Sequence, residues 1–199
     1  MKAWQQLLQN PSFQLENTRA VLTHLSHNHL KDLTQIGCDP RIWVYNSRFN
    51  CDSEQKIKEY IDRALYYREQ FVRIPLAIYD KKLQKYGGST SFYGMNEEYN
   101  KIGIGYTWYG VDLQRTGLNR AVKSLMLEYS FNVLKCRRVE FHINSKNQAS
   151  RASVEYYGAR LEGIIRNDCF RYNGENVDTA LYSILPEDYE NIKEKIIVY

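Results

Sequence analysis

A short turn over residues 114–120, with the sequence QRTGLNR, has the composition of an anion-binding site. Gly117 lets the backbone approach a ligand closely and adopt left-handed torsion angles. Arg115 and Arg120 flank this glycine and can pair with phosphate, and no acidic residue lies in the turn. The residues after Gly117 have helical spacing, and a helix N-terminus exposes unpaired N–H groups and about half a positive charge. The turn therefore predicts a phosphate site; the alternative is an ordinary helix start with two solvated arginines.

The elements around this turn must present it to a ligand. Apolar alternation and turn residues predict strands over 19–25, 73–81, 87–94, 101–110 and 137–144, and a closing hairpin over 160–185 with NGEN as its turn. Helical spacing predicts helices over 26–37, 52–70 and 146–158, one after Gly117, and a short one from Pro186. Antiparallel strands then surround one crossover helix that links two parallel strands. We expect a mixed α/β sheet.

Length and composition favour one globular domain. The chain has 199 residues, 43% of them hydrophobic and 25% charged, which is enough to bury a core without a second domain. No repeat, low-complexity tract or Pro/Gly/Ser-rich linker divides it. We expect a short extension over residues 1–13 and a single domain over 14–199.

The composition argues against several classes of protein. No apolar run approaches the roughly 20 residues that span a bilayer, and the first thirteen residues have no apolar signal region, so we expect a cytoplasmic protein with no membrane contact. The net charge of +4 is mild. Nucleic-acid binding through Arg115, Arg120, Arg137 and Arg138 is an alternative, but it calls for a stronger basic patch than this charge provides.

The cysteines and histidines do not predict a metal site. Cysteines at 38, 51, 136 and 169 have no zinc-site spacing, so we expect four reduced thiols. His24, His27 and His29 lie close together in the chain, where a solvated helix start accounts for them.

Further stretches give the turn a specific context. In Gln114, Gly117 and Asn119 the turn resembles the acetyl-CoA pyrophosphate loop of GNAT acetyltransferases, Gln/Arg-x-x-Gly-x-Gly/Ala, with Asn in place of the last small residue. IGIGYTWYG resembles the pantetheine-binding strand of that family, CRRVEFHINSKNQASRASVEYYGARLEG its second ligand strand and following helix, and VDTALYSILPEDY its closing strand. In this order, over about residues 14–195, they resemble the RimJ/RimL-like branch, the ribosomal-protein-alanine type of N-acetyltransferase.

The resemblance implies a fold and a cosubstrate. It implies a GNAT fold of about seven mostly antiparallel strands and four to five helices, with a V-shaped cleft between the strands at 102–108 and 138–144. Acetyl-CoA would bind in this cleft, with backbone groups of the first strand pairing with pantetheine. The residues implied in acetyl-CoA binding are Gly105, Tyr106, Thr107, Trp108, Gln114, Arg115, Thr116, Gly117, Leu118, Asn119, Arg120, Asn144, Asn147 and Arg151; for Asn147, simple helix capping is an alternative.

The implied reaction is direct attack of a neutral primary amine on the thioester in a ternary complex. Backbone N–H groups near Tyr106 would stabilise the developing oxyanion, and Ser150 would act as the acid for the leaving thiolate. Two family residues are missing: Gly103 stands where many relatives carry a Glu, and Val154 where many carry the acid Tyr. We predict Asp168 as the general base.

Other sources of the base remain open. Asp178 is one candidate, although a partner role in the hairpin also explains it. A water relay is another. Positioning alone also accelerates such a reaction strongly.

The acceptor pocket is implied near the 38–52 segment and the final hairpin. Trp43, Tyr45, Phe49 and Phe170 are expected to line it, or else to lie at the edge of the core. The acceptor is expected to be a protein N-terminus or a small amine, and the protein a monomer or homodimer. Because two catalytic positions depart from the pattern, a catalytically degenerate acyl-CoA-binding or sensor protein is the alternative.

Overall fold

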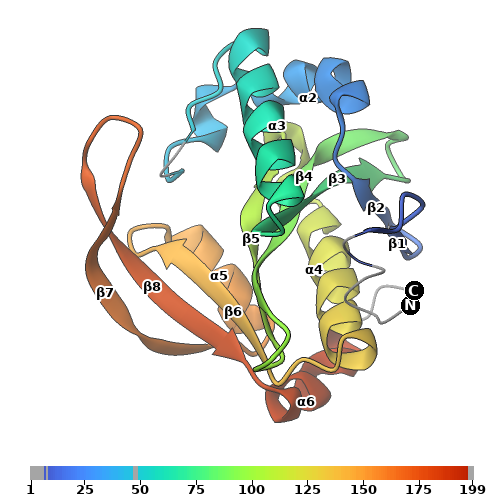
Figure 1. Cartoon of the computed structure of the whole chain (residues 1–199), viewed down its shortest axis with the longest axis vertical. Coiled ribbons are helices and arrows are strands. Elements are labelled where there is room, and N and C mark those ends of the chain that lie inside the picture. Colours follow the sequence, from blue (N-terminus) through green and yellow to red (C-terminus); the bar gives the residue numbers. More distant parts are fainter. Residues whose placement is uncertain (1–6, 8, 47–48, 197–199) are drawn as a thin grey trace.

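An eight-stranded sheet forms the centre of the molecule, in the order β1-β2-β3-β4-β5-β6-β8-β7 (Figure 1). The computed structural model describes residues 7, 9–46 and 49–196. Every neighbouring pair of strands is antiparallel except β5 and β6, which are parallel. The strands are β1 (Gln14–Glu16), β2 (Ala20–His24), β3 (Arg73–Asp80), β4 (Lys85–Asn96), β5 (Lys101–Tyr109), β6 (Arg138–Asn144), β7 (Arg160–Phe170) and β8 (Asn176–Ile184). The expected mixed sheet is confirmed, with the short β1 in addition.

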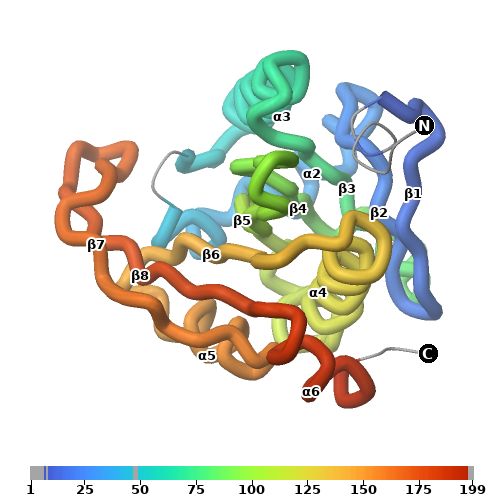
Figure 2. The backbone as a smooth tube through the Cα atoms, turned by 60° about the horizontal axis from the view of Figure 1, so that its bottom comes forward, coloured from blue at the N-terminus to red at the C-terminus, as the bar shows by residue number. Residues whose placement is uncertain are grey.

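Five helices cover the two faces of the sheet. They are α2 (Leu30–Gly37), α3 (Glu54–Glu69), α4 (Leu118–Glu128), α5 (Gln148–Tyr156) and α6 (Pro186–Ile196). Figure 2 shows α2 and α3 on one face and α4, α5 and α6 on the other. Short 3-10 turns occur at His27–His29, Pro40–Ile42 and Val111–Leu113, and α4 runs on into a π turn at Tyr129–Val133. The helix α4 is the crossover between β5 and β6, as the sequence predicts.

The helices begin where the sequence places their caps. Ser53 caps α3, its hydroxyl accepting from the backbone N–H of Lys56, as expected for a serine at this position. The buried residues of α3 include Ile57, Ile61 and Ala64, which recur at helical spacing and face β3. The helix α4 is buried over nearly its whole length because it lies between the sheet and α6.

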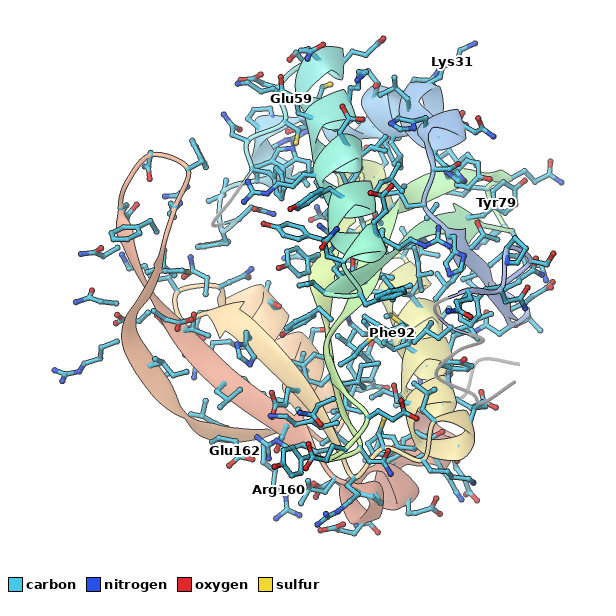
Figure 3. The ribbon with its side chains drawn as sticks, viewed as in Figure 1. Lys31, Glu59, Tyr79, Phe92, Arg160 and Glu162 are labelled. Atoms are coloured by element: carbon cyan, nitrogen blue, oxygen red, sulfur yellow. The ribbon has the colours of Figure 1, made fainter. Side chains whose placement is uncertain are left out.

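Two apolar cores lie on opposite faces of the sheet. The larger is shared by the sheet, α4 and α6 and contains Phe92, which points from β4 toward α4 (Figure 3). Leu7 and Phe13 belong to this core. Both come from the expected 1–13 extension, of which residues 1–6 and 8 lie outside the described part of the chain. The domain boundary at residue 14 stays a prediction.

The closing hairpin is formed by β7 and β8, with the NGEN stretch beginning in the turn and ending at the first residue of β8. The strand β7 is the outermost in the sheet and is mostly exposed. No helix in the described ranges is both long enough and apolar enough to cross a membrane.

Candidate active site

The parallel strands β5 and β6 are joined for only three residues. Lys101 pairs with Arg138, Ile102 with Val139, and Gly103 with Glu140. Beyond these pairs β5 continues to Tyr109 and β6 to Asn144 without further pairing, and Figure 1 shows the two strands separating. We call this opening the β5–β6 split.

The β5 edge of the split carries a bulge. Gly105 pairs with Ser91 and Trp108 with Ser89, so neither strand ladder gives Tyr106 or Thr107 a partner. Tyr106 has a φ of 52°, a left-handed conformation that is costly for a bulky residue. Backbone groups at such a bulge are turned out of the ladder. The structure thus places the predicted pantetheine-binding backbone, from Gly105 to Trp108, at the split.

A buried arginine lies beneath the bulge. The Arg73 guanidinium is 4.0 Å from the centre of the Tyr106 ring, and its Nε donates to Ser91 Oγ at 2.7 Å. Its other terminal nitrogen, NH2, donates to Tyr60 at 2.9 Å, whereas the buried NH1 has no partner among the described residues. This stacking holds the strained residue in place from below.

The turn before α4 is open as predicted. Gly117 is the N-cap of α4 with a φ of 89°, and a Cβ added there would meet no described atom within 4 Å. The first turn of α4 has no acidic residue and the cap has no side-chain hydrogen bond. Arg115 also has a positive φ, of 60°. The N–H groups at this helix start therefore face an uncrowded, positive environment suited to an anion.

The side chains of the turn are used mainly within the protein. Thr116 Oγ1 donates to the Leu113 carbonyl at 2.7 Å, and Gln114 Nε2 donates weakly to the Tyr109 carbonyl at 3.4 Å. The Leu118 side chain is buried in the core. Any contact that these three residues make with a ligand is therefore expected from their backbone N–H groups.

Asn119 and Arg120 make longer-range contacts. Asn119 accepts from the Tyr109 hydroxyl at 3.0 Å and donates to Ser153 Oγ at 2.9 Å, which ties β5, α4 and α5 together. Arg120 donates to the Lys195 carbonyl at the end of α6. The expectation that the Arg120 side chain pairs with phosphate is not supported by this contact.

A second helix N-terminus lies at the open end of the split, because β6 is parallel to β5 and leads into α5. Asn147 caps α5, its side-chain oxygen accepting from the Ser150 N–H at 3.1 Å. Asn144 accepts from the Lys146 N–H at 3.0 Å. The capping role expected for Asn147 is thus present, and the Ser150 hydroxyl lies in the first turn of α5, half-buried.

Arg151 is held by the strand behind it. Its Nε donates to the Tyr182 hydroxyl at 2.9 Å and its NH1 donates to the Ser145 carbonyl at 3.2 Å. The Tyr182 hydroxyl in turn donates to Glu155 at 2.6 Å. This network fixes Arg151 beside the start of α5; its role in binding stays a prediction.

The opposite face of the split is closed by a residue that sequence reasoning missed. The Tyr93 ring lies across Gly103 and Gly105, so that a Cβ at either glycine would come within 2.8 Å of it. The Tyr93 hydroxyl accepts from the His142 backbone N–H at 3.3 Å and so bridges from β4 to β6. The pair of small residues at 103 and 105 was the available signal that a large side chain covers them.

Two ionisable groups lie beside Tyr93 on β6. Glu140 pairs with Gly103 in the ladder, and its Oε2 is 3.6 Å from His142 Nε2. Burial raises the pKa of Glu140, but the hydrogen bond from Arg138 and the charge of Lys101 outweigh burial and leave this pKa below its ordinary value. The carboxylate that the family carries on β5 is absent here, and Glu140 supplies one on the neighbouring strand.

A buried lysine lies on the α4 face of the split. Lys123 is 5% exposed, and its Nζ donates to Thr107 Oγ1 at 3.2 Å. Burial lowers the pKa of Lys123 to about 7. The sequence indicates only an ordinary helix at this position, because a single lysine in a helix interior gives no signal by itself.

The predicted acceptor aromatics do not form one surface. Trp43 is 1% exposed: its indole N–H donates to the Gly37 carbonyl at 2.7 Å, and its ring packs against Trp108. The expectation that Trp43 lines a pocket is therefore wrong, because the ring belongs to the second core. Phe49 is partly buried against Tyr60, while Tyr45 and Phe170 are exposed.

The predicted base is distant from the split in strand order. Asp168 is exposed on β7, and β8 and β6 lie between β7 and the split. Asp178 accepts from the Asn167 N–H at 2.8 Å, which is the hairpin-partner role considered for it. The place expected for a family tyrosine is filled by Val154, which is buried and apolar.

Neither the cysteines nor the histidines form a reactive cluster in the part of the chain that the structure describes. All four cysteines are free, and burial raises the pKa of the Cys51 and Cys136 thiols to about 12, so neither is a thiolate nucleophile at neutral pH. His27 pairs with Asp62 at 2.6 Å. Within the described ranges no three His, Cys, Asp or Glu side chains are arranged to hold a metal.

A cavity of about 530 Å³ lies at the closed end of the split. It is lined by Tyr99, Lys101, Arg137, Arg138, Leu185, Pro186 and Glu187. None of the predicted site residues contributes to it. We therefore place the candidate site at the open end, where the bulge and two helix N-termini meet.

Known proteins share this architecture. A crystal structure of an acetyltransferase from T. thermophilus superposes with a TM-score of 0.83 at 25% identity, covering 92% of this chain and 94% of that one. A spermidine N-acetyltransferase from Vibrio cholerae, solved with CoA and spermine, has a TM-score of 0.69 at 19% identity, covering 88% of this chain and 100% of that one, and so shows the fold alone.

One curated relative is the "Putative ribosomal N-acetyltransferase YdaF" of Bacillus subtilis (strain 168). It is 29% identical over 106 residues, which make up 53% of this chain and 57% of the relative. Its name agrees with the RimJ/RimL-like resemblance. The model of the acetyltransferase (GNAT) domain matches residues 19–160. The chain therefore belongs to the GNAT acetyltransferase family.

Proposed function

We propose that the protein transfers an acetyl group from acetyl-CoA to a primary amine. The observation that carries the proposal is the β5–β6 split, where Tyr106 and Thr107 have no strand partner and the open N-terminus of α4 follows on the same edge. An extended ligand arm can pair with such an unpartnered strand edge. The N–H groups of the α4 start suit the diphosphate at the other end of the same ligand.

The residues at the split fit acetyl-CoA on independent grounds. Gly117 leaves open space where a side chain would crowd a ligand. The α4 start has no acidic residue to repel phosphate. Lys123 is a buried ammonium without an ion pair among the described residues, which indicates an acceptor group at the split. Acetyl-CoA would supply the activated acetyl group as a thioester.

The chain's own residues would position the reaction. Backbone N–H groups from Arg115 to Arg120 would hold the diphosphate, and the bulge at Tyr106 would direct N–H groups toward the carbonyl oxygen that gains charge. Ser150 would give a proton to the departing sulfur. Asn144 and Arg151 would border the thioester end.

Two side chains compete for the proton of the amine. Asp168 is the base that the sequence predicts. His142 is the base that the geometry favours, because it lies next to the split with Glu140 3.6 Å away to stabilise its protonated form. A neutral imidazole removes a proton from an ammonium efficiently near neutral pH.

The acceptor is expected to approach from the face that carries Tyr93, His142 and Glu140. A protein N-terminus fits the name of the Bacillus subtilis relative, and a polyamine fits the name of the Vibrio cholerae structure. The RimJ/RimL-like resemblance favours the protein N-terminus.

The test is release of free CoA thiol from acetyl-CoA with three acceptors: a peptide that begins with alanine, the same peptide with its N-terminus blocked, and spermidine. Turnover with the free peptide but not the blocked one would support transfer to a protein N-terminus. Binding of acetyl-CoA without turnover on any amine would favour the non-catalytic alternative. A protein that does not bind acetyl-CoA would overturn the proposal.

A further inference from the structure

Lys123 occupies a position that ordinary packing does not explain. Its side chain is buried on the sheet-facing side of α4, and among the described residues it donates a single hydrogen bond, to Thr107 Oγ1. An ammonium has three N–H donors, so this environment leaves donor capacity unused. A buried cation without a carboxylate partner is unfavourable unless a ligand compensates for it.

The neighbours of Lys123 place its ammonium between the two separated strands. Thr107 lies on β5 beyond the last paired residue, Gly103. Phe141, whose ring centre is 5.6 Å from Lys123 Nζ, lies on β6 directly after the last paired residue, Glu140. One contact comes from each strand of the split, so the ammonium lies at the base of the opening.

Among the described residues, no nearby charge accounts for the ionisation of Lys123. Burial alone lowers its pKa to about 7. On β6, Glu140 and His142 alternate with the buried Phe141 and so point to the opposite face. On β4 the group nearest to Thr107 is Thr90, which is not ionisable.

Two tyrosines and one arginine complete the surroundings. Tyr109 on β5 bonds to Asn119, one helical turn before Lys123, and burial raises its pKa. Burial also raises the pKa of Tyr157, beside α5, to about 12, so both phenols stay neutral. Arg120, on the preceding turn of α4, is engaged by the Lys195 carbonyl.

We propose that the Lys123 ammonium is a donor-binding group that hydrogen-bonds an amide carbonyl of the pantetheine arm within the β5–β6 split. The inference rests on the proposed binding of acetyl-CoA. Lys123 lies six residues after Gly117, which is about 9 Å along the helix axis. The amide carbonyls of pantetheine are the first strong neutral acceptors at such a separation from the diphosphate held at the helix start.

This contact couples binding to a proton. Only the ammonium has spare N–H groups of sufficient strength, so the bound state favours protonated Lys123 while the free protein has it about half protonated near pH 7. Binding near neutral pH then takes up a fraction of a proton. Affinity falls about tenfold for each pH unit above 7, because deprotonation competes with binding.

The experiment is titration calorimetry with CoA, acetyl-CoA and adenosine 3′,5′-bisphosphate, which lacks the pantetheine arm. The variants are Lys123→Met, which removes the charge and keeps the length, and Lys82→Met as a control at an exposed lysine. We expect Lys123→Met to weaken CoA and acetyl-CoA about tenfold or more and to leave the bisphosphate unchanged. Measurement of the wild type in two buffers of different ionisation enthalpy gives the proton uptake without any variant.

The outcomes separate this inference from the proposed function. Wild-type binding of acetyl-CoA with no proton uptake, or with equal affinity in Lys123→Met, overturns the role of Lys123 alone. Loss that is confined to acetyl-CoA and spares CoA also overturns it, because the thioester carbonyl would then be the acceptor. Acetylation of Lys123 detected by mass spectrometry would overturn it by making the lysine a substrate. No wild-type binding at all refutes the proposed function first.

Discussion

The two faces of the β5–β6 split are built in different ways. On the α4 face, Gly117 leaves open space and Lys123 keeps unused donors. On the other face, Tyr93 covers the glycines of β5 and bonds across to β6, and Arg73 holds Tyr106 from below. The first face has capacity left for a ligand, whereas the second is largely satisfied by the protein itself.

This difference suggests a division of roles. A face with unpaired positive groups gains most when an anionic ligand binds, and so it should carry affinity for the donor. A face with completed side-chain contacts keeps its geometry before any ligand arrives, which suits the alignment of an acceptor amine. Substitutions on the two faces should therefore separate donor affinity from turnover and from stability.

The largest effect is expected on the donor face, from Gly117→Asp. The new carboxylate would lie at the α4 N-terminus, where we place the diphosphate, and would oppose its charge. We expect acetyl-CoA binding to weaken about 1,000-fold, roughly 4 kcal/mol, as measured by calorimetry.

Gly174→Asp is the matched control for this change. Gly174 has a φ of 82° and no described atom within 4 Å of an added Cβ, so the backbone strain and the new charge are the same, but it lies in the β7–β8 hairpin. Its binding of acetyl-CoA should equal that of the wild type. An equal loss in both variants would show that strain, and not a phosphate site, explains the result.

The second effect is expected on the other face, from Gly103→Glu, which restores the carboxylate of the family. A Cβ there would come 2.6 Å from the Tyr93 ring, so we expect a loss of about 3 kcal/mol in the free energy of unfolding, measured with urea. In a Tyr93→Ala background the same change should cost little. Gly163→Glu, at an open glycine on β7, should be nearly neutral. A full cost that persists without the Tyr93 ring would contradict the clash.

The third effect concerns turnover alone. We expect His142→Gln to lower kcat about 100-fold, because a positioned base contributes about this much, while acetyl-CoA affinity is unchanged. Asp168→Asn is the counterpart and should keep nearly full activity. The reverse result, with activity lost only at Asp168, would restore the base predicted from sequence and remove His142 from the mechanism.

The sequence predicts the donor face well because its residues are contiguous. The turn at 114–120 and the strand before it form one local unit, so spacing alone gives the glycine, the helix start and the order of elements. The structure has Gly117 as the N-cap of α4, as this pattern indicates. Local sequence is enough where the function is carried by backbone groups.

The other face is harder to predict because it is assembled from distant strands. Tyr93 meets His142 only through the pairing of β4, β5 and β6, and nothing in the sequence near either residue indicates this bond. Trp43 was misplaced for a related reason: an aromatic residue in an irregular segment has no periodicity to show whether it faces the core. Lys123 was missed because burial of a single lysine depends on tertiary packing.

The shortness of the β5–β6 ladder has a mechanical consequence. Three residue pairs join the two parts of the sheet along one seam at the closed end. A rotation about such a seam displaces the far end of β6, at Asn144, more than the near end, as a lever does. Changes at the closed end, where Lys101 and Arg138 line a cavity, would therefore be magnified at the catalytic end.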